Sequence, residues 1–155
     1  MEDIIVRLAT EADVPGLLPL IRLVSAAMGE TLPPEADVAA IVRRQIADEH
    51  HEYVIAEMEG HILGYVFVCY YLATWAGAPC AMFQDFIVEE GWRGRGVGST
   101  ILAYARNRAR IKGCAYVDLI VPSALEGARR FFRRWDFRPT DREIMRLKIA
   151  RPNPT

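Results

Sequence analysis

The 155-residue sequence has only three cysteines and contains no long apolar run. Cys69, Cys80 and Cys114 are widely spaced and form no Cys-x-x-Cys pair, so free and mostly buried thiols are expected. No apolar stretch reaches the roughly 18–20 residues that a membrane-spanning helix needs. The opening residues MEDIIVRLAT carry acids where a secretory signal would carry Lys or Arg. These absences argue against a secreted or membrane protein and predict a cytoplasmic one.

Histidine is also scarce, and the three that occur do not suggest a metal site. His50, His51 and His61 have no acidic or Cys partners at the spacing of metal ligands. We therefore expect surface histidines and no metal cofactor.

The net charge of −1 hides a strong asymmetry along the chain. Residues 1–90 hold 4 Lys and Arg against 15 Asp and Glu, whereas residues 91–155 hold 15 against 5. A basic second half suits a polyanionic ligand, and an acidic first half suits a cationic one. Two sets of solvated faces, interleaved in space, would explain the same counts, so the sequence leaves both interpretations open.

Hydrophobic periodicity and turn signals predict one mixed-sheet α/β domain over residues 1–149, followed by a C-terminal tail at 150–155. The predicted chain order is β-α-α-β-β-β-α-β-α-β. The strands are expected at 4–10, on either side of Glu59-Gly60 within 52–73, at 80–88, at 115–121 and within 137–149. The helices are expected from Thr10 to about Met28, over about 36–48, over 97–112, and from a capping box at Ser123 and Glu126 to about Trp135.

The stretch GWRGRGVGST, residues 91–100, follows a predicted strand and leads into a predicted helix. Gly94, Gly96 and Gly98 permit backbone conformations closed to other residues and leave main-chain N–H groups accessible. Such N–H groups at a helix N-terminus bind anions, and Arg93 and Arg95 add positive charge. The stretch therefore predicts an anion-binding turn.

Three familiar glycine motifs do not fit this turn. A Walker loop would end in Gly-Lys-Ser/Thr, a dinucleotide fingerprint needs Gly-x-Gly-x-x-Gly after a first strand, and arginine–glycine RNA-binding repeats come as disordered arrays. The spacing Arg93-x-x-Gly96-x-Gly98 instead resembles the pyrophosphate-binding signature of the GNAT superfamily of acyl-CoA-dependent N-acyltransferases. The family's order of strand, signature, helix, strand and helix spans 80–137, and IIVRLATEAD looks like its first strand and helix.

The resemblance implies a single-domain GNAT-like fold, with a mixed, largely antiparallel central sheet flanked by helices and two splayed strands that hold CoA. Acetyl-CoA would be the acyl donor, and an amine would attack its thioester directly. No metal, nucleic acid or membrane partner is implied, and a homodimer is compatible with the family. The residues that would hold acetyl-CoA are Arg93 and the main-chain N–H groups of Gly94, Arg95, Gly96, Val97, Gly98 and Ser99, with Phe86, Ile87 and Val88 beside the thioester, where main-chain donors would polarise its carbonyl.

The attacking amine must lose a proton, which a carboxylate can accept directly or through water. Some relatives carry adjacent acids at the positions of Gln84 and Asp85. Gln84 cannot act as a base, whereas Asp85 can, and it is the candidate catalytic residue. A structural Asp, hydrogen-bonded or at a bulge, is the alternative interpretation, and Asp118 interrupts the next strand in a similar way.

The last predicted helix departs from the family pattern. Leu125 replaces an Asn, and Asp136 replaces a Gly. Phe132 stands where the family has a Tyr that commonly protonates the departing CoA thiolate. Tyr104 and Tyr116 are substitutes by residue type, although packing aromatics are the simpler explanation.

The sequence thus predicts an acetyl-CoA-dependent N-acetyltransferase that acts on a primary amine, either a small cationic amine or a Lys side chain. The acidic first half favours a cationic acceptor. The alternative, supported by Phe132, is a CoA- or acetyl-CoA-binding sensor or structural module with little or no turnover.

Overall fold

A computed structural model describes residues 3–152, which form two compact units. The first unit ends at Ile120 and holds the central sheet, whereas the second begins at Val121 and holds one helix. The first unit contains, in chain order, β1 (Ile5–Leu8), α1 (Val14–Ala27), α2 (Glu35–Ala47), β2 (His51–Met58), β3 (His61–Ala73), β4 (Ala78–Val88), α3 (Val97–Ile111) and β5 (Val117–Leu119). The second unit contains α4 (Glu126–Arg134).

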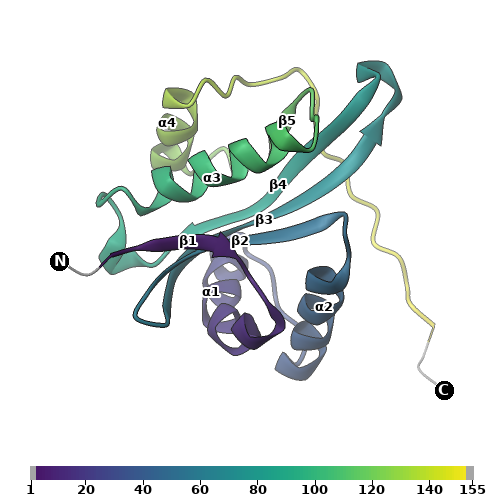
Figure 1. Ribbon diagram of the computed structural model, residues 1–155. Coiled ribbons are helices and arrows are strands. Elements are labelled where there is room, and N and C mark those ends of the chain that lie inside the picture. Colours follow the sequence, from purple (N-terminus) through teal and green to yellow (C-terminus); the bar gives the residue numbers. More distant parts are fainter. Residues whose placement is uncertain (1–2, 153–155) are drawn as a thin grey trace. The chain divides into compact units, whose positions relative to one another are not determined.

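The five strands form one mixed sheet in the order β1-β2-β3-β4-β5 (Figure 1). The first four strands pair antiparallel, and β5 pairs parallel to β4. The hairpin between β2 and β3 turns at Glu59 and Gly60, whose φ angles of 50° and 81° suit a tight two-residue turn. The expected turn and the mixed, largely antiparallel sheet are both confirmed.

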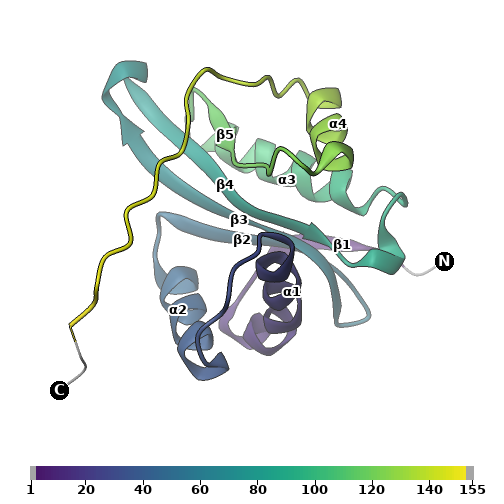
Figure 2. The ribbon, with the colours of Figure 1, turned by 180° about the vertical axis from the view of Figure 1, so that it is seen from behind.

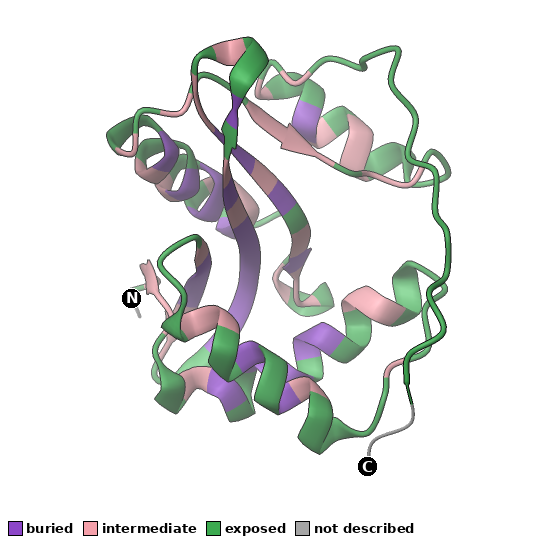
Figure 3. Ribbon diagram, turned by 90° about the vertical axis from the view of Figure 1, so that its right-hand side faces the viewer, coloured by how far each residue is buried: buried purple, intermediate pink, exposed green. Residues whose placement is uncertain are grey.

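Helices cover both faces of this sheet (Figure 2). On one face α1 and α2 bury a core with side chains of alternate strand residues, among them Tyr53 of β2 and Tyr65 and Phe67 of β3. On the other face α3 turns its buried residues, such as Ile101, toward the sheet. The middle strands are accordingly buried along most of their length (Figure 3).

The junction between β1 and α1 is fixed by an ion-pair cluster. Asp13 accepts hydrogen bonds from the Thr10 main-chain N–H at 2.7 Å and from the Arg7 guanidinium at 2.7 and 2.8 Å. The same guanidinium contacts Glu57 of β2 at 3.0 Å. These bonds hold the pKa of Asp13 below its ordinary value, chiefly through Arg7. These bonds anchor the start of α1 against the sheet edge. They lie where the sequence predicted a helix start, at Thr10.

The second unit differs from expectation at both ends. The predicted capping box is wrong, because Pro122 to Leu125 form a turn closed by the Leu125 N–H on the Pro122 carbonyl at 3.0 Å, and α4 begins only at Glu126. No strand occurs within 137–149, although one was expected there. Ile144, Met145, Leu147 and Ile149 are between 64% and 91% exposed. Apolar alternation favours a strand, but a strand forms only where a neighbouring ladder accepts it.

Candidate functional site

The glycine-rich turn after β4 has the backbone that its sequence requires. After a short turn at Glu90–Trp92, Gly94 and Gly96 have φ angles of 73° and 86°, in the left-handed region. A Cβ at either position would meet no atom within 4 Å, so conformation rather than space calls for glycine there. Both residues are exposed, and the main chain between β4 and α3 is open to a ligand.

The N-terminus of α3 carries free hydrogen-bond donors. Gly96 is the N-cap residue, and no side chain caps the helix. The Thr100 N–H is bonded to the Gly96 carbonyl at 3.1 Å, whereas the N–H groups of Val97, Gly98 and Ser99 precede the first residue that can bond within the helix. These donors lie at the positive end of the helix dipole. The predicted residues therefore fit an anionic group such as a pyrophosphate.

The two arginines of the turn are held against it. Arg93 donates from Nε to the Val88 carbonyl at 3.0 Å, so it ties the turn to the end of β4. The Arg95 guanidinium lies 4.0 Å from the centre of the Trp92 ring. Both residues are exposed and add positive charge beside the free N–H groups.

The two parallel strands beside the turn are paired over a short length only. Residues Ala81–Phe83 of β4 pair with Val117–Leu119 of β5, and β4 then continues to Val88 without a β5 partner. The expected splay is therefore present, and β4 has no β5 partner along Phe86, Ile87 and Val88.

Gly64 of β3 holds this segment close, and the sequence reading missed it. A Cβ at Gly64 would lie 2.6 Å from the Ile87 carbonyl oxygen and 3.1 Å from the Val88 Cα. Only glycine permits such an approach of two strands. A lone glycine inside an apolar strand is a known sign of close backbone contact, and it would have identified this position.

A β-bulge in β4 places Asp85. Phe67 of β3 pairs with Asp85 and Val68 pairs with Phe83, so Gln84 is the extra residue. Because directly paired residues share a face of the sheet, Asp85 lies on the face of Phe67, beneath α1 and α2. Without the extra residue, Asp85 would share the opposite face with Phe83.

The carboxyl group of Asp85 is half-buried, and burial raises its pKa above the ordinary value. Within residues 3–152 it has neither an ion pair nor a side-chain hydrogen bond. The pKa values of Tyr53 and Tyr65 are raised, first by burial and then by the negative charge of Asp85. Asp85 is therefore a carboxylate in apolar surroundings, with phenols near it. Asp118, the other acidic candidate, lies on β5 opposite Met82.

The substitutions noted in the last helix have visible consequences within the second unit. The Phe132 ring packs edge-on against Phe131 and Phe137, at centroid distances of 5.2 and 5.7 Å. Asp136 has a φ of 67°, the left-handed conformation that explains a Gly in the family pattern and that Asp tolerates better than most residues.

The two tyrosines named as substitutes lie in the first unit. Tyr104 is half-buried on α3, and Tyr116 is 56% exposed and packs on the Trp75 ring at 5.3 Å. The contact of Tyr116 agrees with a packing aromatic.

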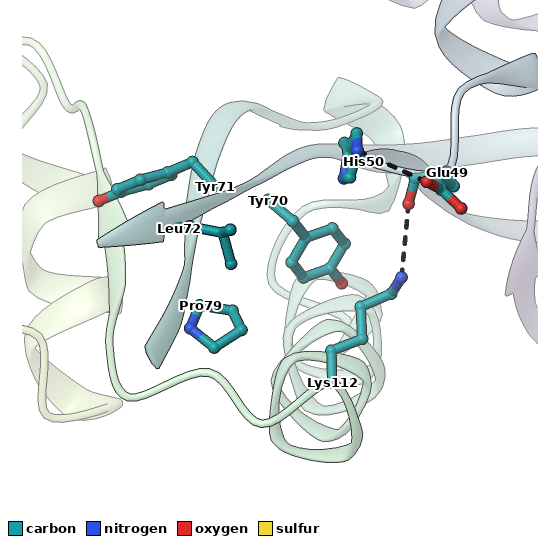
Figure 4. Close-up of a pocket in the computed structure, with 7 residues that line it drawn as sticks. All are labelled: Glu49, His50, Tyr70, Tyr71, Leu72, Pro79 and Lys112. Carbon is teal, nitrogen blue, oxygen red and sulfur yellow. Dashed lines mark hydrogen bonds and ion pairs between the residues drawn. The ribbon is translucent and has the colours of Figure 1, made fainter. Parts of the chain in front are cut away.

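An open pocket of about 620 Å³ lies at the other end of the β3–β4 hairpin (Figure 4). Its base includes Lys112, whose Nζ donates to the Glu49 carbonyl at 3.5 Å and lies 4.6 Å from the Tyr70 ring centre. None of the predicted site residues lines it. The lining residues are Glu49, His50, Tyr70, Tyr71, Leu72, Pro79 and Lys112.

Three further observations bear on the composition of the chain. Cys69, Cys80 and Cys114 are free thiols as expected, but only Cys80 is buried, and the other two are half-buried. No cluster of three or more His, Cys, Asp or Glu side chains in residues 3–152 has the arrangement of a metal site. No helix in the same range combines the length and apolar character needed to cross a membrane.

A mixed sheet that opens between two parallel strands, next to a helix N-terminus without a side-chain cap, offers main-chain donors to an anionic ligand. The sequence profile of the acetyltransferase (GNAT) family matches residues 19–137, which include both strands and the turn. The chain belongs to this family, and it is an acetyl-CoA-dependent N-acetyltransferase by that membership. No curated protein matches the sequence.

Solved structures share the fold at low sequence identity. A ribosomal-protein-alanine N-acetyltransferase from Brucella melitensis biovar Abortus 2308 is 16% identical with a TM-score of 0.79, covering 95% of this chain and 100% of its own. The aminoglycoside N-acetyltransferase AAC(6')-Iy in complex with CoA is 16% identical with a TM-score of 0.83, covering 97% of both chains. An aminoglycoside acetyltransferase from an uncultured soil metagenomic sample, in complex with sisomicin, is 17% identical with a TM-score of 0.77, covering 96% of this chain and 97% of its own.

Proposed function

We propose that this acetyltransferase transfers an acetyl group to a primary amine, either a small cationic amine or a Lys side chain, by direct attack while both substrates are bound. The acidic first 90 residues favour a cationic acceptor. Relatives of the same fold act on aminoglycosides and on a protein alanine, so amines of both sizes are compatible with it.

The donor side of the site consists of main-chain groups. The N–H groups from Gly94 to Ser99 would hold the pyrophosphate of acetyl-CoA, with Arg93 and Arg95 adding charge. When bound, acetyl-CoA supplies the activated acyl group as a thioester. The main chain at Phe86–Val88, which lacks a β5 partner, would orient that thioester and polarise its carbonyl. Gly64 keeps this edge in place from the neighbouring strand.

The acceptor side depends on Asp85, and the observation that carries the proposal is its position. It is a half-buried carboxylate without a protein partner in the described residues, one residue after the bulge and next to the splayed segment. Burial raises its pKa, which makes the ionised form a stronger base than an exposed Asp. Asp85 accepts the proton that the amine loses.

Thiol release from acetyl-CoA, measured with a panel of polyamines, aminoglycosides and Lys peptides, tests the proposal. At least one cationic amine should release thiol together with one equivalent of acetylated product. Asp85→Asn should lower turnover by roughly 10²–10⁴-fold while the affinity for acetyl-CoA is unchanged.

Asp118→Asn is the matched control, because Asp118 is also a half-buried strand Asp but lies on β5. It should keep most of the activity. Near-normal turnover of Asp85→Asn across the pH range would show that Asp85 is structural. Acetyl-CoA binding without thiol release for any primary amine would contradict the proposed reaction itself.

A further inference from the structure

Tyr65 of β3 carries a buried hydroxyl group without a hydrogen-bond partner in the described part of the chain. Its side chain is 0% exposed, and its Oη is among the few buried side-chain atoms left unpaired. Buried hydroxyl groups are nearly always paired with protein or with an ordered water. We therefore expect the Tyr65 hydroxyl to have a hydrogen-bond partner.

The sheet register places this hydroxyl beside Asp85. Phe67 pairs directly with Asp85, and Tyr65 precedes Phe67 by two residues on the same face. Tyr65 and Asp85 are thus diagonal neighbours on adjacent strands, roughly 7–8 Å apart at the main chain and within reach of a long aromatic side chain. The negative charge of Asp85 acts on the Tyr65 phenol.

Tyr53, the second phenol near Asp85, is already paired. Its hydroxyl donates to the Gln45 Oε1 of α2 at 2.5 Å, and its ring lies 5.6 Å from that of Tyr65. The two tyrosines therefore share a position near the carboxylate but differ in whether their hydroxyl groups are satisfied. This difference gives Tyr65 a matched control.

The helices packed on this face bring no charged partner to Asp85 from their described residues. Arg22 of α1 pairs with Glu35 at 2.6 Å, and Arg43 of α2 lies 3.7 Å from Glu11. His51 of β2, on the same face, stacks on the Phe67 ring at 5.5 Å and lies 3.5 Å from Asp48. The groups on which the Asp85 charge acts are the phenols of Tyr53 and Tyr65. Of these two phenols, only that of Tyr65 has a hydroxyl hydrogen without an acceptor in the described residues.

We propose that Tyr65 is a positioning residue for Asp85, donating a hydrogen bond to a buried water that in turn donates to the carboxylate. A water is proposed because the two side chains do not bond directly, and a single water can bridge two polar groups in this way. This bridge favours the ionised carboxylate and fixes its orientation toward the acceptor amine. The inference rests on the proposed role of Asp85 as the base.

An NMR titration of carboxyl carbons in the full-length protein labelled with ¹³C-aspartate tests this bridge without any amine. The Asp85 signal is assigned from its absence in Asp85→Asn. In Tyr65→Phe the midpoint of the Asp85 titration should rise by roughly half a pH unit or more, because a hydrogen bond to the charged form is lost. In Tyr53→Phe it should move by less than about 0.2 unit, because that hydroxyl is paired with Gln45. An unchanged midpoint in Tyr65→Phe, or equal shifts in both variants, would overturn the proposal.

Kinetics separate this inference from the proposed function. Tyr65→Phe should lower kcat by roughly tenfold or less, move the acidic limb of the pH profile upward, and leave the KM for acetyl-CoA unchanged. Added to Asp85→Asn, it should cause no further loss. If Asp85→Asn is inactive while Tyr65→Phe has a wild-type pH profile, the proposed role of Asp85 as the base is supported and the role of Tyr65 is refuted. If Asp85→Asn is active, the proposed base fails whatever Tyr65 does.

Discussion

Gly64→Ala is expected to damage both the fold and the donor side of the site through one contact. The added Cβ would lie 2.6 Å from the Ile87 carbonyl oxygen, 3.1 Å from the Val88 Cα and 3.2 Å from the Ile101 Cδ1. The Ile101 methyl can move, but the two main-chain atoms belong to a hydrogen-bonded ladder. Overpacking of this kind costs typically about 1–3 kcal/mol. For a chain of this size that corresponds to a fall in Tm of about 2–12 °C.

The same displacement should weaken acetyl-CoA binding, because β4 would move where its main chain is proposed to face the thioester. Thermal unfolding with and without acetyl-CoA, together with calorimetric titration, measures the two effects. Gly91→Ala is the control: Gly91 has an ordinary φ, and a Cβ there meets no atom within 4 Å. It should change stability by less than about 0.5 kcal/mol. A Gly64→Ala protein with the stability and acetyl-CoA affinity of the wild type would refute the close-contact argument.

Three further changes test other parts of the structure. Gly96→Glu places a charge where the pyrophosphate would bind and strains a φ of 86°, so calorimetry should detect no acetyl-CoA binding in a protein that circular dichroism shows to be folded. Arg108→Ala removes the guanidinium that holds Glu52 at 2.8 and 3.0 Å, and the nearest cation left to this 8% exposed carboxylate in the described residues is Lys112 at 3.4 Å. Urea unfolding should show a loss of about 3 kcal/mol. Burial raises the pKa of Asp85, so Asp85→Asn should stabilise the fold at pH 7. That gain in stability should fade as the pH falls through the raised pKa, because the folded wild type then takes up the proton. Urea unfolding of both proteins between pH 3 and 7 measures the difference. A difference that stays constant over this range would contradict the argument.

The elements with a strong local signal were predictable from the sequence. The turn at Glu59-Gly60, the helix at 35–47 and the helix after the glycine turn each combine hydrophobic periodicity with a residue that stops or starts the element. The structure of residues 137–149 was not predictable in this way. Its alternating apolar residues favour a strand, but this segment pairs with no neighbouring strand in the described structure. The capping box failed for a related reason: the turn at Pro122 competes for the same residues.

The candidate site divides in the same way. The predicted anion-binding turn could be found from the spacing of its glycines, because the local backbone conformation requires Gly94 and Gly96. The role of Gly64 and the partnerless hydroxyl of Tyr65 depend on the register between strands, which no local pattern specifies. Sequence reasoning could name Asp85 as an acid in an apolar strand, but only the register shows which face of the sheet it occupies.

In the proposed reaction, the bulge at Gln84 allows one strand to serve both substrates. Regular alternation would put Phe83 and Asp85 on one face, so the acid would point toward α3. The extra residue reverses the alternation, and Asp85 joins Phe67 beneath α1 and α2 while the main chain beyond it leaves its β5 partner. In the proposed reaction, the edge of β4 would then offer main-chain groups to a thioester. The Asp85 side chain would not block that edge, because side chains stand roughly perpendicular to the sheet. Main-chain donors need no particular residue types, so substitutions on the donor side are expected to be tolerated. Differences among relatives should therefore concentrate on the face where Asp85, Tyr53 and Tyr65 lie.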